Sequence, residues 1–131
     1  MSNSTGVIQA LREGKHDAAL CQIYALDGEE ANVKKARDRA IRVVEKFVET
    51  FRPDANVDIA LFSSPGRTEI GGNHTDHQHG RVLCGSVDLD MLACAAPNRL
   101  DMIRICSEGY PLDEVHFNME LAQESSPWFQ R

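Results

Sequence analysis

The chain is organised around one stretch between two apolar segments, Ser63-Ser64-Pro65-Gly66-Arg67-Thr68-Glu69-Ile70-Gly71-Gly72-Asn73-His74-Thr75-Asp76-His77-Gln78-His79-Gly80. It contains four glycines, one arginine, three histidines and one aspartate. A purely structural connection does not need so many chemically active side chains. The stretch therefore predicts a functional site.

The first half of this stretch predicts a turn that presents a cation. Pro65 presets its own φ angle and Gly66 tolerates a positive φ, a combination typical of tight turns. Such a turn would end the preceding strand and direct Arg67 away from it. Arg67 would then place a permanent planar cation at a strand end, and its alternative role is an ion pair with Glu69 that holds the turn.

The second half predicts a ligand-binding loop. Gly71 and Gly72 have no side-chain bulk, so a ligand can approach the backbone closely. The four polar residues that follow offer the mixed donors and acceptors that recognise polyhydroxylated substrates, namely Asn73, His74, Thr75 and Asp76. For His74 and Asp76 the alternative is a local role, an Asx-turn and a loop hydrogen bond.

The order of these residues resembles a kinase signature. Pro65-Gly66-Arg67, followed by Gly72-Asn73-His74-Thr75-Asp76 and Gly80, is similar to the N-terminal signature of galactokinases, in the superfamily of galactose, homoserine, mevalonate and phosphomevalonate (GHMP) kinases. The family pattern reads Pro-Gly-Arg-x-x-x-x-Gly-Glu-His-Thr-Asp-Tyr, so Asn73 replaces a glutamate and His77 a tyrosine. These departures affect the expected sugar more than the phosphotransfer chemistry.

The resemblance implies an activity and a role for each matched residue. In the complete enzyme, ATP with Mg²⁺ passes its γ-phosphoryl group to the anomeric hydroxyl of galactose or a related hexose. Arg67 is then the catalytic residue, since an arginine can stabilise the charge on the migrating group. The implied partners are the sugar and ATP, and the implied substrate-binding residues are Asn73, His74, Thr75 and Asp76.

The same resemblance predicts that the chain is an N-terminal fragment. Galactokinases have a Gly-Ser-rich loop that wraps the nucleotide phosphates and then a catalytic aspartate, and the sequence shows neither. We therefore expect the chain alone to be inactive and to bind neither ATP nor Mg²⁺ tightly. The sequence fixes neither the hexose nor the oligomeric state.

Two other classes of function stay open. His74, Asp76, His77 and His79 could ligate zinc in a metal-dependent hydrolase, because imidazole and carboxylate groups are common zinc ligands. Their order resembles the second half of the His-x-His-x-Asp-His motif of metallo-β-lactamase-like hydrolases, but Gly72 stands where that motif has a histidine. The other alternative is a sugar-binding module without catalysis.

Length, charge and cysteine spacing limit the setting. The 131 residues fit one domain with a real core, and the net charge of -6 argues against nucleic-acid and anionic-membrane partners. No apolar run approaches the roughly 20 residues of a membrane span, and the start has no basic n-region, so we expect a soluble protein. Four separated cysteines predict small buried thiols in a reducing cytoplasm, namely Cys21, Cys84, Cys94 and Cys106.

Apolar spacing predicts helices in residues 1–53. Residues 4–14 form the first, with a Ser or Thr cap and Gly14 as its stop, and a short helix follows. Residues 27–51 form the longest, whose apolar stripe is typical of a helix packed on a core and which Pro53 ends. Its basic residues alternate with acidic ones, which indicates a solvated face rather than a basic patch.

Residues 54–131 are predicted to form strands. The order of elements indicates an α+β fold, a single partial domain with N-terminal helices on a mixed sheet. The resemblance implies the same fold, because the N-terminal domain of GHMP kinases is related to a ribosomal-protein domain. The predicted strands are 57–62, 81–96 as two strands separated at Asp88-Leu89-Asp90, and 102–107 with 114–118, which form either a hairpin or adjacent strands.

Overall fold

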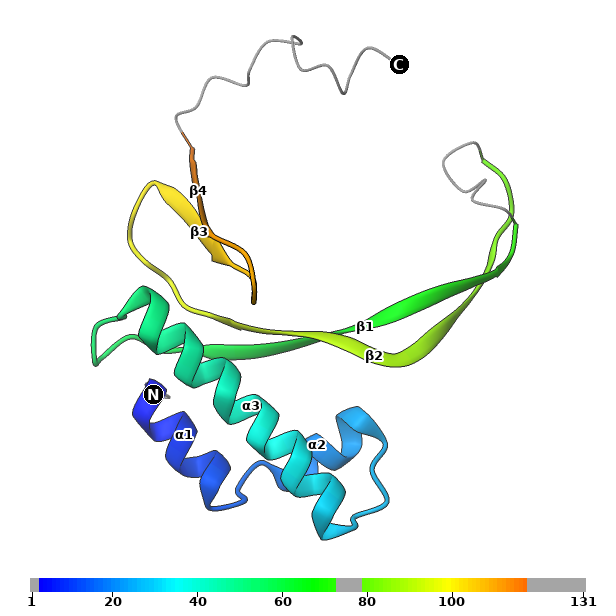
Figure 1. Cartoon of the computed structure of the whole chain (residues 1–131), viewed down its shortest axis with the longest axis horizontal. Coiled ribbons are helices and arrows are strands. Elements are labelled where there is room, and N and C mark those ends of the chain that lie inside the picture. The colour runs from blue at the N-terminus through cyan, green and yellow to red at the C-terminus, as the bar shows by residue number, and fades with distance from the viewer. Residues whose placement is uncertain (1–2, 73–78, 118–131) are drawn as a thin grey trace, which may run out of the picture. The chain divides into compact units, whose positions relative to one another are not determined.

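The computed structural model describes residues 3–72 and 79–117, which form two compact units that divide after Pro97 (Figure 1). The first unit contains three helices and an antiparallel ladder, and the second contains an antiparallel hairpin. The predicted α+β class is confirmed. The expected mixed sheet has no parallel pair within the described residues. The elements are α1 (Ser4–Arg12), α2 (Asp17–Tyr24), α3 (Glu30–Phe51), β1 (Ala60–Gly71), β2 (Leu83–Ala95), β3 (Met102–Cys106) and β4 (Leu112–His116).

The first helix begins and ends at local sequence signals. Asn3 is its N-cap, and the Asn3 side chain accepts a hydrogen bond of 2.8 Å from the backbone N–H of Gly6. The cap is therefore Asn3 and not the serine or threonine that the sequence analysis expected, although an asparagine satisfies the free N–H groups equally well. Gly14 follows with a φ of 72°, which agrees with its predicted role as the stop.

The longest helix starts later than predicted. Residues 27–29 lie before α3, and the Asp27 carboxylate accepts a hydrogen bond of 3.0 Å from the backbone N–H of Glu29. This local bond competes with a helical start at Asp27. The helix ends as predicted, because Arg52 adopts a left-handed φ of 46° and Pro53 cannot continue the helical bonding.

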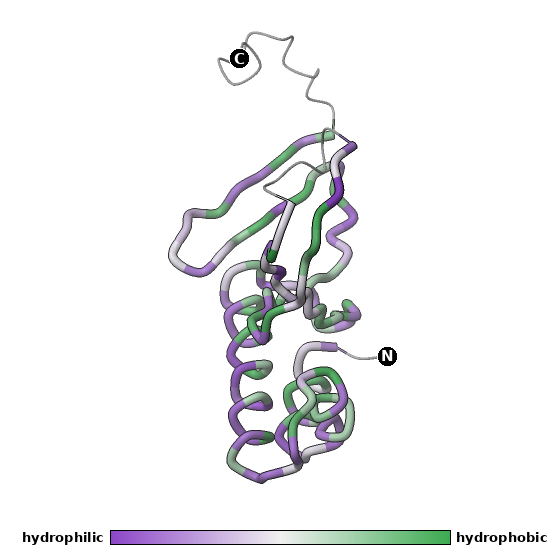
Figure 2. Tube along the Cα trace, turned by 90° about the vertical axis from the view of Figure 1, so that its right-hand side faces the viewer, coloured by the Kyte–Doolittle hydropathy of each residue, from purple (hydrophilic) through white to green (hydrophobic). Residues whose placement is uncertain are grey.

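The buried residues of the first unit come mainly from its helices. Leu11 of α1 and Val33, Ala40 and Val44 of α3 are buried, and Ile59 joins them just before β1. Both α1 and α2 contact α3, so α3 is the centre of this helical layer. Figure 2 shows hydrophobic residues recurring along the otherwise hydrophilic α3, as the predicted stripe requires.

The ladder of β1 and β2 contains two register shifts, one between Glu69 and Gly71 and one between Pro65 and Arg67, and we call the second of these the irregularity. Pairing is regular from Ala60 opposite Ala95 to Pro65 opposite Asp90, and it resumes with Arg67 opposite Ser86. Gly66 therefore faces three residues of β2, residues 87–89, and β2 carries two extra residues. Extra residues on one strand bend it and increase its twist.

Two strand predictions are corrected by this ladder. Pro65-Gly66 does not form a turn that ends a strand, because β1 continues through both residues to Gly71. Long-range pairing with β2 overrides the local turn preference, and a proline is tolerated because β1 pairs on one side only among the described residues. Residues 81–96 also contain one strand rather than two, and the predicted break at Asp88-Leu89-Asp90 lies at the irregularity.

Of the two arrangements predicted for the last strands, the hairpin is confirmed, although its second strand, β4, begins at Leu112 and not at residue 114. β3 and β4 pair from Met102 opposite His116 to Cys106 opposite Leu112, and Gly109 in the turn has a φ of 83°. Arg104 and Glu114 stand directly opposite each other, and Arg104 Nε donates a hydrogen bond of 2.8 Å to Glu114 Oε1. Opposite charges at facing positions favour this register.

The cysteines are less covered than the sequence analysis expected. All four are free thiols, Cys84 is exposed, and the other three are half-buried. Burial raises the pKa of the Cys94 thiol to about 11, so it stays protonated at neutral pH. No helix in the described part of the chain is long and apolar enough to cross a membrane.

Candidate functional site

The ends of the predicted ligand loop meet at Gly72. This residue has a φ of 117°, and a Cβ atom placed on it would lie 2.6 Å from Val82 Cα and 2.7 Å from the carbonyl oxygen of Arg81. Only glycine fits such a close approach of two backbones. By contrast, nothing lies within 4 Å of a Cβ placed on Gly71. The two ends of the loop are thus in close backbone contact at Gly72, which we call the closed base of the loop, whereas a side chain would have space at Gly71.

The second close approach of the ladder lies next to Arg67. A Cβ atom on Gly66 would lie 2.9 Å from Val87 Cγ2 and 3.2 Å from the carbonyl oxygen of Leu89. Gly66 is therefore required by the packing of the irregularity and not by a turn. Arg67 follows at once, exposed and opposite Ser86, so the irregularity determines where the predicted catalytic cation lies.

The predicted substrate-binding residues lie outside the described residues. This applies to Asn73, His74, Thr75 and Asp76, so their roles stay predictions. Of the proposed zinc ligands, only His79 is described, and it is exposed. No group of three His, Cys, Asp or Glu side chains in residues 3–72 and 79–117 could hold a metal ion.

A polar cluster that the sequence analysis missed lies beside this stretch. The Asp90 side chain is only 11 % exposed and accepts hydrogen bonds from Ser63 Oγ at 2.6 Å and Tyr24 Oη at 3.0 Å. The guanidinium of Arg39 pairs with the same carboxylate and also donates a bond of 3.2 Å to the Asp90 carbonyl oxygen. We call these four residues the Asp90 joint, and it connects α2, α3, β1 and β2.

The joint holds Asp90 in its ionised form. Burial is the largest influence on its carboxyl group and raises the pKa, but hydrogen bonds from Ser63, Arg39 and Tyr24 together outweigh it. The pKa of Asp90 therefore lies below its ordinary value. Burial also raises the pKa of Tyr24, and the hydrogen bond to the charged Asp90 raises it further. At neutral pH the joint thus consists of a carboxylate surrounded by donors.

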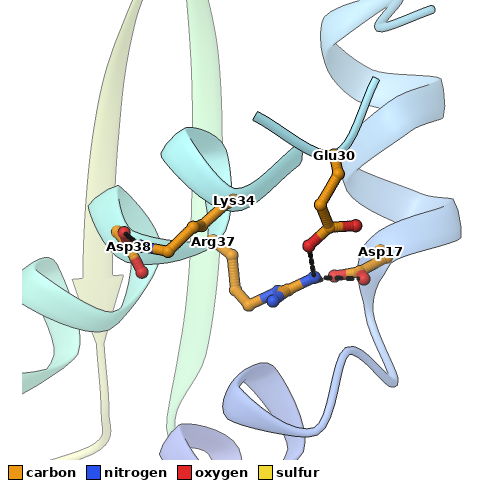
Figure 3. A network of polar contacts seen from close by, with 5 residues as sticks. All are labelled: Asp17, Glu30, Lys34, Arg37 and Asp38. Atoms are coloured by element: carbon orange, nitrogen blue, oxygen red, sulfur yellow. Dashed lines mark hydrogen bonds and ion pairs between the residues drawn. The ribbon is translucent and has the colours of Figure 1, made fainter. Parts of the chain in front are cut away.

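A second charged contact resembles the joint but stays within the helical layer. Arg37 of α3 donates two hydrogen bonds to the Asp17 carboxylate of α2, from Nε at 3.0 Å and from Nη2 at 2.5 Å. Glu30 lies 3.8 Å from the same guanidinium, and Lys34 pairs with Asp38 at 2.5 Å (Figure 3). The Lys34–Asp38 pair agrees with the interpretation of the α3 charges as a solvated face, whereas Arg37 is only 16% exposed and holds α3 against α2.

One hollow among the described residues lies away from Arg67. It has a volume of about 310 Å³ and lies at the other end of the ladder, where it is lined by Ile59, Ala60, Phe62 and Ala95 among others. Ala60 precedes Arg67 by seven residues along β1, a distance of roughly 23 Å in an extended strand. The hollow is therefore separate from the predicted site.

Residues 45–97 match the family model described as the galactokinase galactose-binding signature. The chain carries a galactokinase signature. The match begins in α3 and includes both strands of the ladder, the irregularity and the loop between the strands. The resemblance drawn from residues 63–80 is thereby confirmed.

Two bacterial galactokinases are similar to part of the chain. The galactokinases of Lactococcus lactis subsp. cremoris (strain MG1363) and Lactococcus lactis subsp. lactis (strain IL1403) are each 30% identical to it over 79 residues. That alignment covers 60% of this chain and 19% of each relative, so the chain spans about a fifth of the length of the relatives it matches. No solved structure matches the chain.

Proposed function

We propose that this chain forms the sugar-binding part of a galactokinase-like phosphotransferase that acts on galactose or a related hexose. The observation that carries the proposal is the galactose-binding signature over residues 45–97. That range contains β1, β2 and the whole loop that connects them. The two Lactococcus relatives, both galactokinases, support the same class of reaction.

In this proposal Arg67 and the loop residues have separate roles. Arg67 stabilises the negative charge that develops as the γ-phosphoryl group moves to the anomeric hydroxyl, a contribution that is electrostatic and depends on position. Asn73, His74, Thr75 and Asp76 hold the sugar hydroxyls through directional hydrogen bonds. The closed base at Gly72 keeps the beginning and the end of the loop together.

ATP and Mg²⁺ complete the proposed reaction. When bound, they supply the phosphoryl group and neutralise the charge on its oxygens. Mg²⁺ that is bound with ATP is held by the phosphates and usually by only one or two protein carboxylates. In this proposal the described residues contribute by positioning Arg67 and the ends of the sugar loop.

Two measurements test the proposal. The first titrates the chain with galactose and with its C4 epimer glucose by calorimetry, and we expect saturable binding of galactose with discrimination against glucose. The second measures galactose-dependent ADP release by the chain and by the protein encoded by the whole reading frame that contains it. We expect turnover from the latter and none from the chain alone.

The alternative functions give different results in the same experiments. A sugar-binding module would bind galactose, and neither protein would release ADP. A zinc hydrolase would carry stoichiometric zinc after purification without added metal, and chelation would remove its activity. Absence of galactose binding and of galactose-dependent turnover in both proteins would refute the kinase proposal.

A further inference from the structure

We propose that Asp90 is a positioning residue that sets the strand register on which the location of Arg67 depends. The inference rests on the proposed function, in which Arg67 acts on the migrating phosphoryl group. It adds a residue on β2 that does not itself touch the substrate.

Asp90 lies at the edge of the regular part of the ladder. Asp90 stands opposite Pro65 in the last regular pair before the irregularity, and Arg67 belongs to the first pair after it. The Ser63 hydroxyl donates its 2.6 Å bond to Asp90 although Ser63 itself pairs with Leu92. This diagonal bond therefore ties the beginning of the functional stretch to the residue where the regular pairing stops.

The ladder has an alternative register. If β2 lacked its two extra residues, the register that pairs Arg67 with Ser86 would continue through Pro65. Asp88 would then stand opposite Pro65 instead of Asp90. Side chains alternate with a period of two, so a slip of two residues leaves every side chain on its original face. Burial of one face therefore does not oppose this slip, and another interaction must select the register.

The Asp90 joint is the interaction that selects the present register. Arg39 and Tyr24 hold the Asp90 carboxylate on α3 and α2, and Ser63 joins β1 to the same carboxylate. Asp88 carries the same side chain two residues earlier but is exposed. The joint thus distinguishes two chemically identical residues by their distance along β2. A slip would move residues 60–65 of β1 by roughly 7 Å relative to their present partners. Arg67 would stay opposite Ser86, but the pair would shift relative to residues 60–65 and the helices joined to Asp90.

The register of the chain can be measured without any activity. Ser64 now faces Met91, whereas the slipped register would place it opposite Leu89. We expect cross-strand nuclear Overhauser contacts between Ser64 and Met91 in the wild type, and contacts between Ser64 and Leu89 in Asp90→Ala. Asp17→Ala is the matched control, because it removes the same charge and frees Arg37 on α3 without touching the ladder. It should keep the contact between Ser64 and Met91.

The catalytic consequence is measured in the protein encoded by the whole reading frame. We expect Asp90→Ala to lower kcat on the order of a hundredfold, as a misplaced catalytic group does, with a much smaller change in KM for galactose. Asp17→Ala should change kcat less than about twofold, since it alters only the helical layer. If the substitutions acted only by lowering stability, kcat would fall by a similar factor in both variants.

Several outcomes would overturn the inference. Contacts between Ser64 and Met91 that persist in Asp90→Ala would show that the joint does not select the register. Equal losses of kcat in Asp90→Ala and Asp17→Ala would leave Asp90 with a structural role only. If Asp90→Ala does not fold, Ser63→Ala removes the β1 bond alone and decides by the same contacts. A wild-type protein that does not phosphorylate galactose refutes the proposed function instead, while the register measurement still decides the role of the joint.

Discussion

The helical layer and the β1–β2 ladder of the first unit are held by different interactions. The helices bury apolar side chains such as Leu11 and Val44, with exposures of 2% and 0%. No described residue of β1 or β2 is buried to this degree, and large apolar side chains such as Phe62 and Met91 are mostly exposed. The directional hydrogen bonds of the Asp90 joint connect the ladder to α2 and α3.

The two kinds of interaction contribute differently to the stability of the fold and to the position of its side chains. Apolar burial is non-directional, so the helical layer contributes free energy of folding without specifying the place of any one atom. Hydrogen bonds to a carboxylate are directional, so the joint specifies geometry with few contacts. We therefore expect substitutions in the helices to change mainly stability, and substitutions at the joint to change the position of Arg67 as well as stability.

The largest expected effect is on catalysis, from Arg67→Ala in the protein encoded by the whole reading frame. Removal of a cation that contacts the transition state should lower kcat on the order of a thousandfold and change KM much less. Steady-state kinetics with varied galactose provides the measurement. The melting temperature should stay close to that of the wild type, because Arg67 is exposed.

Two results would contradict the role given to Arg67. A rise in KM with unchanged kcat would assign it to ground-state binding of the substrate. A lower melting temperature with unchanged kinetics would support its alternative role in an ion pair, such as the one with Glu69 considered in the sequence analysis.

The second prediction concerns the helical layer. Leu11→Ala should lower the free energy of unfolding by about 2–5 kcal/mol, because it removes buried methyl groups and leaves a cavity against α3. Urea denaturation of the chain followed by circular dichroism measures this loss. Ile23→Ala is the control, since Ile23 is 59% exposed and its truncation should cost far less. Equal losses in both variants would show that Leu11 does not belong to a packed core.

The third prediction gives the joint a pH dependence. The folded-state pKa of Asp90 lies below the unfolded value of about 3.9, so its contribution is fully present above that value and is lost as the pH falls through the folded pKa. Asp90→Asn should lower the stability at neutral pH by about 1–3 kcal/mol and flatten the loss of stability below about pH 4. Denaturation curves at several pH values test this. An unchanged acid profile in the variant would contradict it.

Much of the fold could be predicted because its signals are local. The stripe of α3, the stop at Gly14 and the turn around Gly109 each involve neighbouring residues, and each agrees with the structure. The turn predicted at Pro65-Gly66 was wrong because pairing with β2, which comes later in the chain, overrides local preference. Local propensity cannot report a partner strand.

The sequence proposed residues for the candidate site but not the contacts that support it. Arg67 was proposed from its position in the signature and its role stays a prediction, whereas the Asp90 joint was missed because its partners lie 27, 51 and 66 residues away in the sequence. The available signal was Asp88-Leu89-Asp90, an acidic interruption of an apolar strand. Of these two aspartates Asp90 is the covered one, and it requires donors because a buried carboxylate without them is costly.

The smallest expected effect concerns Asn73, which stands where the galactokinase pattern has a glutamate and lies outside the described residues. A glutamate would make charge-assisted hydrogen bonds of roughly 1.5–3 kcal/mol to sugar hydroxyls, and the neutral amide makes bonds nearer 0.5–1.5 kcal/mol. Asn73→Glu should therefore tighten galactose binding by up to about tenfold, the factor that corresponds to about 1.4 kcal/mol.

Calorimetric titration of the wild type and Asn73→Glu with galactose and its deoxy and amino analogues checks this expectation. If residue 73 contacts one hydroxyl, the gain should disappear for the analogue that lacks that hydroxyl and persist for the others. The amide can donate as well as accept, so the wild type should tolerate substitution at that position better than the variant. An affinity that is unchanged for every sugar would mean that Asn73 holds the loop and does not touch the substrate, and the sugar contacts would then rest on His74, Thr75 and Asp76.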